Sequence, residues 1–206
     1  WLESSVGGGH IFDWSSSGIV AKVEIAHCVM LQKNASKAVV QGTSTGGVFS
    51  IWMHDFEYLY QASATVSPIN IRSFTVNSIT LERFWSTCQT QAASAPSIVV
   101  ESTNPGGQAF NVLVRQGVFE FSVGGAVKLL SCANCSIEDC TVYDISTTTT
   151  DHQFYIGRGT TGPSSYCCNV RRCRSFVGNT TYADLYIDTT QPGQSNFVVD
   201  CCGFYY

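Results

Sequence analysis

Charged side chains are scarce in this chain of 206 residues. Asp, Glu, Lys and Arg make up 13% of it, against 44% apolar residues, and the formal net charge is -4. Such a composition is typical of an ordered protein that buries a core, and it excludes an intrinsically disordered chain. The small acidic excess gives no broad attraction for phosphate backbones, so we expect no nucleic-acid partner.

Long hydrophobic runs are also missing. No stretch of about 18 uncharged apolar residues occurs, so we expect no membrane insertion. The first residues (WLESSVGGGH) have neither the basic start nor the apolar run of a signal peptide, and no Met begins the chain. We therefore expect a segment of a longer protein, with a single domain covering residues 1–206.

Signatures of several enzyme classes are absent as well. The chain has no Gly-x-Ser-x-Gly elbow and no Walker loop, so a serine hydrolase and a nucleotide-dependent enzyme have no support in the sequence. We expect no cofactor. Good helix-forming stretches are nearly missing too, while β-branched and aromatic residues alternate over short runs between clusters of turn residues. This pattern predicts an all-β protein.

What the sequence does contain is a repeat. Residues 135–145 (CSIEDCTVYDI) hold one copy: an apolar residue, two polar residues, then Cys or another residue that fits a core. Seven copies occur, with fourth positions at 28, 56, 84, 117, 140, 173 and 202, so the steps are 28, 28, 33, 23, 33 and 29 residues. Searching for such self-similarity comes first, because a missed repeat leads to the wrong fold.

The repeat length points to one architecture. A unit of this size, built from short strands and variable turns, is typical of one coil of a parallel β-helix, a solenoid whose coils stack on one another. We therefore predict a right-handed parallel β-helix of about seven to eight coils of roughly 29 residues. A propeller blade needs about 40 residues, and a leucine-rich repeat would show its Leu and Asn ladder.

The repeat also assigns directions to side chains. In each copy the first and fourth positions point into the core, the second points outward, and the third lies at a bend between strands. The inward set includes Cys28, Cys140, Cys173 and Cys202. Reduced thiols acting as small buried apolar residues are the favoured interpretation. A disulfide framework stays open, as does a zinc site formed by residues 132–135 (CANC) and 167–168 (CC).

The outward positions form a strip of polar and aromatic residues. The candidate catalytic carboxylates in it are Glu57, Glu82 and Glu138, and the candidate substrate-binding residues are His54, Trp85 and Arg115. Two carboxylates on a rigid scaffold suit glycoside chemistry, because one protonates the leaving oxygen while the other activates water or attacks the sugar. An indole beside them can stack on a pyranose face.

Spacing distinguishes the possible carboxylate pairs. Glu82 and Glu138 lie two coils apart, about 9.6 Å at the usual strand spacing, which is near the upper limit for an inverting pair. Glu57 and Glu82 lie one coil apart and suit a retaining pair better. A solvated charged strip without a catalytic role is the simpler interpretation, since outward strand positions tend to be polar.

Four stretches of the chain together resemble a known family: HIFDWSSSG, VEIAHCVML, CSIEDCTVYDI and NVRRCRSF. In coil pattern and turn composition the chain is similar to the pectin-lyase-like parallel β-helices, and most of all to the tailspikes of tailed bacteriophages. No catalytic motif of a named family matches. The resemblance implies a homotrimer in a virion tail appendage, assembled in the host cytoplasm together with other tail proteins. It also implies binding of a host surface glycan, which many members cleave.

Three functional classes therefore stay open. The leading one is a phage tailspike or tail-fibre β-helix that recognises a host surface polysaccharide, with or without depolymerase activity. The second is a non-catalytic structural shaft or adhesin segment, and the third is a free polysaccharide lyase or glycoside hydrolase. The chain shows neither the head domain nor the C-terminal trimerisation domain of a full tailspike, which again predicts a segment of a longer protein.

Overall fold

The computed structural model describes residues 1–5, 8–15, 18–60, 65–88, 95–121, 124–144, 151–177, 182–188 and 196–205. These residues form strands joined by turns and bends, with no helix among them. No helix that could cross a membrane is found in these ranges either. The all-β prediction is confirmed.

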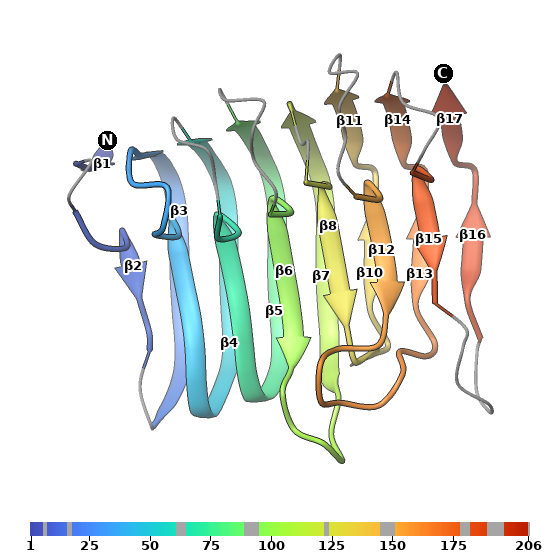
Figure 1. The fold of residues 1–206 in the computed structure, drawn as a ribbon, viewed down its shortest axis with the longest axis horizontal. Helices are drawn as coiled ribbons and strands as arrows, with labels where there is room; N and C mark the ends of the chain where they lie inside the picture. The colour runs from blue at the N-terminus through green and yellow to red at the C-terminus, as the bar shows by residue number, and fades with distance from the viewer. Residues whose placement is uncertain are drawn as a thin grey trace.

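The strands of the described ranges belong to one sheet (Figure 1). The long ones are β3 (Ile19–Gln32), β4 (Val40–Tyr60), β5 (Ile69–Cys88) and β7 (Ala109–Glu120). The shorter ones in the first part of the chain are β1 (Leu2–Ser4), β2 (Phe12–Asp13) and β6 (Ile98–Ser102). Those that follow β7 are β8 (Val127–Leu130), β9 (Cys132–Ala133), β10 (Ser136–Glu138), β11 (Thr141–Asp144), β12 (Phe154–Gly157), β13 (Asn169–Arg171), β14 (Arg174–Val177), β15 (Leu185–Ile187), β16 (Val198–Asp200) and β17 (Gly203–Tyr205).

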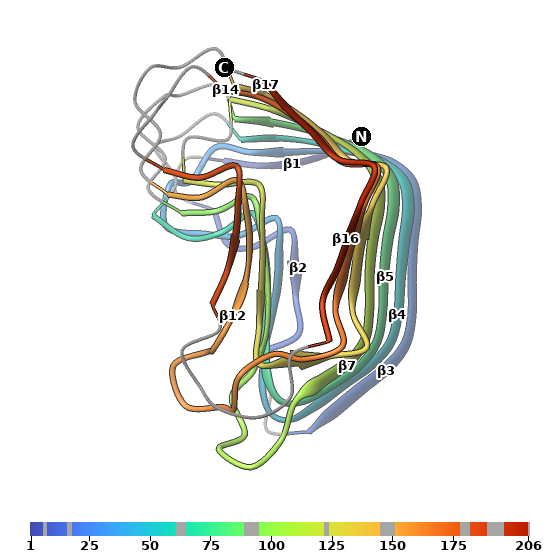
Figure 2. The same ribbon diagram turned by 90° about the vertical axis from the view of Figure 1, so that its right-hand side faces the viewer.

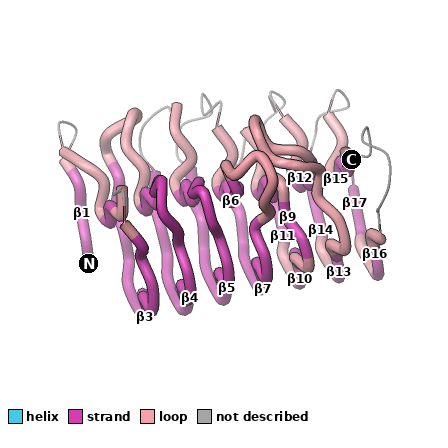
Figure 3. Tube along the Cα trace, turned by 90° about the horizontal axis from the view of Figure 1, so that it is seen from below, coloured by secondary structure: helices cyan, strands magenta, loops and turns pink. Residues whose placement is uncertain are grey.

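All strand pairings in the described ranges are parallel, and their register follows the repeat. The first positions of the copies pair in sequence: Ile25 with Met53, Met53 with Leu81, Leu81 with Val114, Val114 with Ile137, Ile137 with Val170 and Val170 with Val199. The predicted alignment of the seven copies is thus confirmed. Strands that are one repeat apart in sequence lie side by side in the sheet, as β3, β4, β5 and β7 do in Figure 3.

The parallel sheet is curled, and the core lies inside the curl. In Figure 2, β2 and β12 lie on one side, while β3, β4, β5 and β16 lie on the other. Apolar side chains from both sides form one continuous buried cluster, which includes Ile51, Ile71 and Val100. The ends of the chain lie at opposite ends of the curled sheet (Figure 1).

A left-handed backbone residue bends the chain in every copy. The third positions are His27, Asp55, Arg83, Gln116, Asp139, Arg172 and Cys201, and their φ angles all lie between 50° and 55°. A single residue in this region turns the strand sharply, although it costs energy for any residue with a Cβ. The predicted bend at the third position is confirmed. We call the row of these residues the corner column.

The inward positions are filled as predicted, except at the two ends of the sheet. Phe56 and Phe84 stack in the core with ring centroids 5.1 Å apart. Gly117 occupies the next inward position because the ring of Phe84 takes the space that a Cβ there would need. Cys28 is only partly buried, and Val199 near the other end is exposed.

The nine cysteines whose side chains the structure describes are all free thiols. Five are fully or almost fully buried, namely Cys132, Cys135, Cys140, Cys168 and Cys173. Burial raises the pKa of the Cys135 thiol, and such a thiol stays protonated and unreactive. Of the four cysteines predicted to point inward, Cys140 and Cys173 are buried as small core residues, whereas Cys28 and Cys202 are only partly buried. Among the described cysteines there is no disulfide and no thiol group with the geometry of a metal site.

Candidate functional site

The predicted strip lies on both sides of the corner column. His54 on β4, Glu82 on β5, Arg115 on β7 and Glu138 on β10 pair in one row before the corner. Glu57 and Trp85 pair with each other after it. The register therefore brings all six predicted residues onto neighbouring strands, but in two separate rows.

The expectation of a solvated strip is wrong at its centre. His54 is 6% exposed and Glu82 is 3% exposed, although both side chains point away from the core. The reason is that outward side chains on adjacent parallel strands lie only about 4.8 Å apart and cover one another. Trp52, Arg83 and Arg115 contact Glu82 from the same strand and its two neighbours.

Glu82 is the centre of a charge network. Arg115 Nε donates to its Oε2 at 2.6 Å, and Arg115 Nη2 contacts the same oxygen. Trp52 Nε1 and Arg83 Nη1 donate to Oε1 at 3.1 and 2.9 Å. Burial raises the pKa of Glu82, but the hydrogen bonds from Arg115 and Trp52 and the charges of the two arginines outweigh burial and lower it. The carboxylate is therefore ionised at neutral pH.

His54 lies between two carboxylates. Its Nδ1 is 2.7 Å from Asp55 Oδ2, and its Nε2 is 3.0 Å from Glu24 Oε1. The imidazole also stacks on the indole of Trp52 with ring centroids 4.0 Å apart. The hydrogen bonds to Asp55 and Glu24 raise the pKa of His54, because both partners favour the protonated ring.

Asp55 and Arg83 form a two-pronged ion pair within the corner column. Arg83 Nε donates to Asp55 Oδ1 at 2.7 Å, and Nη2 donates to Oδ2 at 2.9 Å. These bonds, together with the bond from His54, hold the pKa of Asp55 far below its usual range. A parallel fork of this kind fixes both partners in direction as well as in distance.

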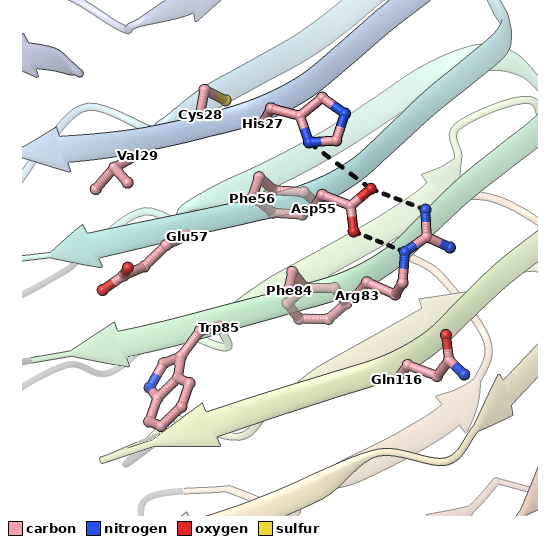
Figure 4. A pocket seen from close by; sticks show the side chains of 10 residues that line it. All are labelled: His27, Cys28, Val29, Asp55, Phe56, Glu57, Arg83, Phe84, Trp85 and Gln116. Carbon is pink, nitrogen blue, oxygen red and sulfur yellow. Dashed lines mark hydrogen bonds and ion pairs between the residues drawn. The ribbon is translucent and has the colours of Figure 1, made fainter.

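An open depression of about 430 Å³ adjoins this network (Figure 4). His27, Asp55, Arg83 and Gln116 border it along the corner, and Glu57 and Trp85 border it on the strands beyond the corner. Trp85 is 47% exposed, so part of its indole is open to a ligand. The depression therefore combines an accessible aromatic surface with side chains whose positions are held by ion pairs.

Glu138 lies apart from this depression. Between it and Glu82 is Arg115 on β7, so the two carboxylates are two strand steps apart, as the repeat predicts. The nearest basic group to Glu138 is Arg172, at 4.0 Å. Arg172 itself forms a two-pronged pair with Asp139, at 2.6 and 2.8 Å. Glu57 and Glu82, the other candidate pair, lie on opposite sides of the corner.

Sequence reasoning missed two groups of residues. One is the partners of the predicted site, Trp52, Asp55 and Arg83, of which the last two were predicted only as bend residues. Their spacing of 28 residues, one repeat, was the available signal for the ion pair. The other is a row of exposed aromatics on β11, β14 and β17, in which Phe176 stacks on Tyr143 and Tyr205 with centroid distances of 5.3 and 4.9 Å.

In comparisons with protein families, curated proteins and solved structures, nothing matches this chain.

Proposed function

We propose that the curled parallel sheet is a right-handed parallel β-helix of seven to eight coils, and that it is a tailspike or tail-fibre segment that binds a host surface polysaccharide. The register of the seven copies supports the coil assignment. In Figure 2 the C-terminal end of the sheet faces the viewer, with β12 on the left and β16 on the right. Figure 1 shows that β12 runs downward and β16 runs upward. A chain that turns in this direction as it approaches the viewer supports a right-handed coil.

The observation that carries the binding proposal is Trp85 at the edge of the open depression. A half-exposed indole provides a flat apolar surface for a sugar ring, and the polar groups beside it can bond to hydroxyls. Glu57 lies next to Trp85 in the register, and Gln116 lies on the following strand. The backbone under these residues is a continuous parallel ladder, so they are presented on a rigid surface.

The network around Glu82 favours binding over cleavage. A general acid for glycoside cleavage needs a carboxyl group with a raised pKa, and that of Glu82 is lowered. Its two oxygens already accept bonds from Trp52, Arg83 and Arg115. The catalytic roles of Glu57, Glu82 and Glu138 stay predictions, and so do the homotrimer, the other tail proteins as partners and the place in a virion.

Glycan binding can be measured on an array of bacterial capsular and lipopolysaccharide glycans, followed by calorimetry on the best ligand. We expect wild-type protein to bind at least one of them, and Trp85→Ala to bind it at least about fivefold more weakly, because the loss of one stacking surface is worth about 1 kcal/mol or more. Phe74→Ala is the matched control, since Phe74 is also exposed and also lies on β5, but does not line this depression.

The alternatives predict other results. A structural shaft would bind no glycan on the array, and an equal loss in Trp85→Ala and Phe74→Ala would place the binding surface elsewhere. Mass spectrometry of the incubated glycans would detect a depolymerase or a free hydrolase or lyase by fragment release. A gain of one water would indicate hydrolysis, and an unsaturated end would indicate elimination.

A further inference from the structure

Two histidines and one aspartate converge at the corner: His27 comes from β3, and His54 and Asp55 come from β4. His54 Nδ1 lies 2.7 Å from Asp55 Oδ2, and His27 Nδ1 lies 4.0 Å from the same oxygen. The three possible ligand atoms all lie within 4.8 Å of one another. We propose that His27, His54 and Asp55 bind a divalent transition-metal ion of the zinc class. This inference does not depend on glycan binding.

The choice of metal class follows from the ligand atoms. Imidazole nitrogens suit Zn²⁺, Co²⁺, Ni²⁺ and Cu²⁺, whereas Ca²⁺ and Mg²⁺ require a set made only of oxygens. Two imidazoles and one carboxylate are a common set of three protein ligands for zinc, which leaves a coordination position for water or for another ligand. His27 and Asp55 border the depression of Figure 4, so that position would face the solvent.

The neighbours of His54 fix the orientation of its imidazole ring, as metal coordination requires. Its other ring nitrogen, Nε2, lies 3.0 Å from Glu24 Oε1, and the ring stacks on Trp52. A metal-binding imidazole almost always donates its second N–H to a carboxylate or carbonyl, which sets the tautomer and directs the lone pair to the ion. Glu24 would have this supporting role, and it would leave Nδ1 as the nitrogen that faces Asp55 and His27.

Arg83 would compete with the ion for the carboxylate of Asp55. Its Nε and Nη2 hold the two oxygens of Asp55, and Nη2 is also 3.4 Å from His54 Nδ1. The ion would displace Nη2 from Oδ2 while Nε keeps its bond to Oδ1. Glu24, Asp55 and Glu82 supply three negative charges around the site against the positive charges of Arg83 and Arg115, so a cation can still be accommodated.

Co²⁺ alone is the probe, because its visible absorption reports the number and type of its ligands. We expect wild-type protein to take up one equivalent, with d–d bands of a nitrogen and oxygen site, in calorimetry and absorption titrations under reducing conditions. His27→Gly should bind at least about tenfold more weakly, and Glu24→Gln should also lose about tenfold in affinity. Glycine suits the left-handed backbone of His27, and the His27 side chain is 76% exposed, so this variant should fold.

His152→Ala is the matched control, since His152 lies just before β12, where its ring stacks on Tyr155 and Tyr186. Equal affinity of His27→Gly and wild type would overturn the proposal. A strong sulfur-to-cobalt charge-transfer band that disappears in Cys201→Ser would also overturn it, because Cys201 is an exposed thiol and would then be the ligand. No uptake of Co²⁺ by the wild type would overturn it as well.

Discussion

Residues 19–88 and residues 127–177 follow the same register but are built differently. In the first region β3, β4 and β5 have 14, 21 and 20 residues, whereas the strands of the second have at most 4. The fourth, inward position of the repeat holds the partly buried Cys28 and the buried Phe56 and Phe84 in the first region, and Cys140 and Cys173 in the second. One repeat thus accommodates both wide and narrow core columns.

The corner column shows which contacts belong to the scaffold. Asp55 pairs with Arg83 in the first region, and Asp139 pairs with Arg172 in the second, each through two hydrogen bonds. Because both regions have this pair, we infer that it has a role at the bend that is common to both regions. It holds residues in a backbone conformation that is unfavourable for side chains other than glycine.

What differs is the set of groups around the pair. In the first region it is joined to His54, Glu82 and, through Glu82, to Trp52. In the second, the neighbouring exposed surface is the aromatic row of Tyr143, Phe176 and Tyr205. The comparison therefore directs the search for function to the residues that are joined to the pair in one region only, which in the first region are His54, Glu82 and, through Glu82, Trp52.

The largest effect on stability should come from a substitution in the phenylalanine column of the first region. Phe84→Ala should lower the free energy of unfolding by about 3–5 kcal/mol, because a large cavity would open between Phe56 and Phe119. Cys173→Ala should lower it by only about 1 kcal/mol, because little apolar volume is removed. Urea denaturation measures both. Equal losses of stability in the two variants would contradict the difference in core packing between the two regions.

A smaller effect is expected from the buried carboxylate of the first region. Glu82→Gln should lower the free energy of unfolding by about 2 kcal/mol, because bonds from Arg115 and Arg83 to an ionised group would become bonds to a neutral amide. Glu138→Gln in the second region is the control and should cost less than about 1 kcal/mol, since its nearest basic group is 4.0 Å away. A larger loss at Glu138 would contradict the difference between the regions.

The smallest effect should be a pH dependence that belongs to the first region. Asp55 and Glu24 raise the pKa of His54, so this stabilisation is present below the unfolded value of about 6.5 and is lost as the pH rises through the folded pKa. Asp55 and Glu82 have lowered pKa values, so their contribution is present above the unfolded values of about 4 and is lost as the pH falls. Stability should therefore be greatest between about pH 5 and pH 6.5.

The variant His54→Gln tests the alkaline side of this profile. It should remove much of the decline above about pH 6.5, measured by urea denaturation at a series of pH values. His152→Gln, in the second region, should leave the decline in place. If the wild type and His54→Gln lose stability in parallel as the pH rises, the histidine does not carry this dependence.

Much of the fold could be predicted from the sequence because the same pattern of apolar and polar residues occurs in all seven copies. Apolar residues at the first and fourth positions specify which side of a strand is buried, and a slip of one residue would expose them. The spacing between copies then specifies which residues pair on neighbouring strands. His54, Glu82, Arg115 and Glu138 lie in one row for this reason.

The state of those side chains could not be predicted in the same way. An outward position reads as solvent-exposed, yet Glu82 is covered by Trp52, Arg83 and Arg115, whose reach depends on rotamers and not on spacing. The pKa of Glu82 could not be predicted either. Burial raises it, whereas the hydrogen bonds from Arg115 and Trp52 and the charges of Arg115 and Arg83 lower it.

The sequence by itself determined that the chain is all-β, where each copy bends and which residues share a row, because these properties follow from local patterns that recur along the chain. Only the tertiary structure decided which of these residues touch. Asp55 meets Arg83 and His27 through strands that are one repeat apart. Such contacts depend on side-chain directions at a corner where three strands come together, and no local pattern encodes those directions.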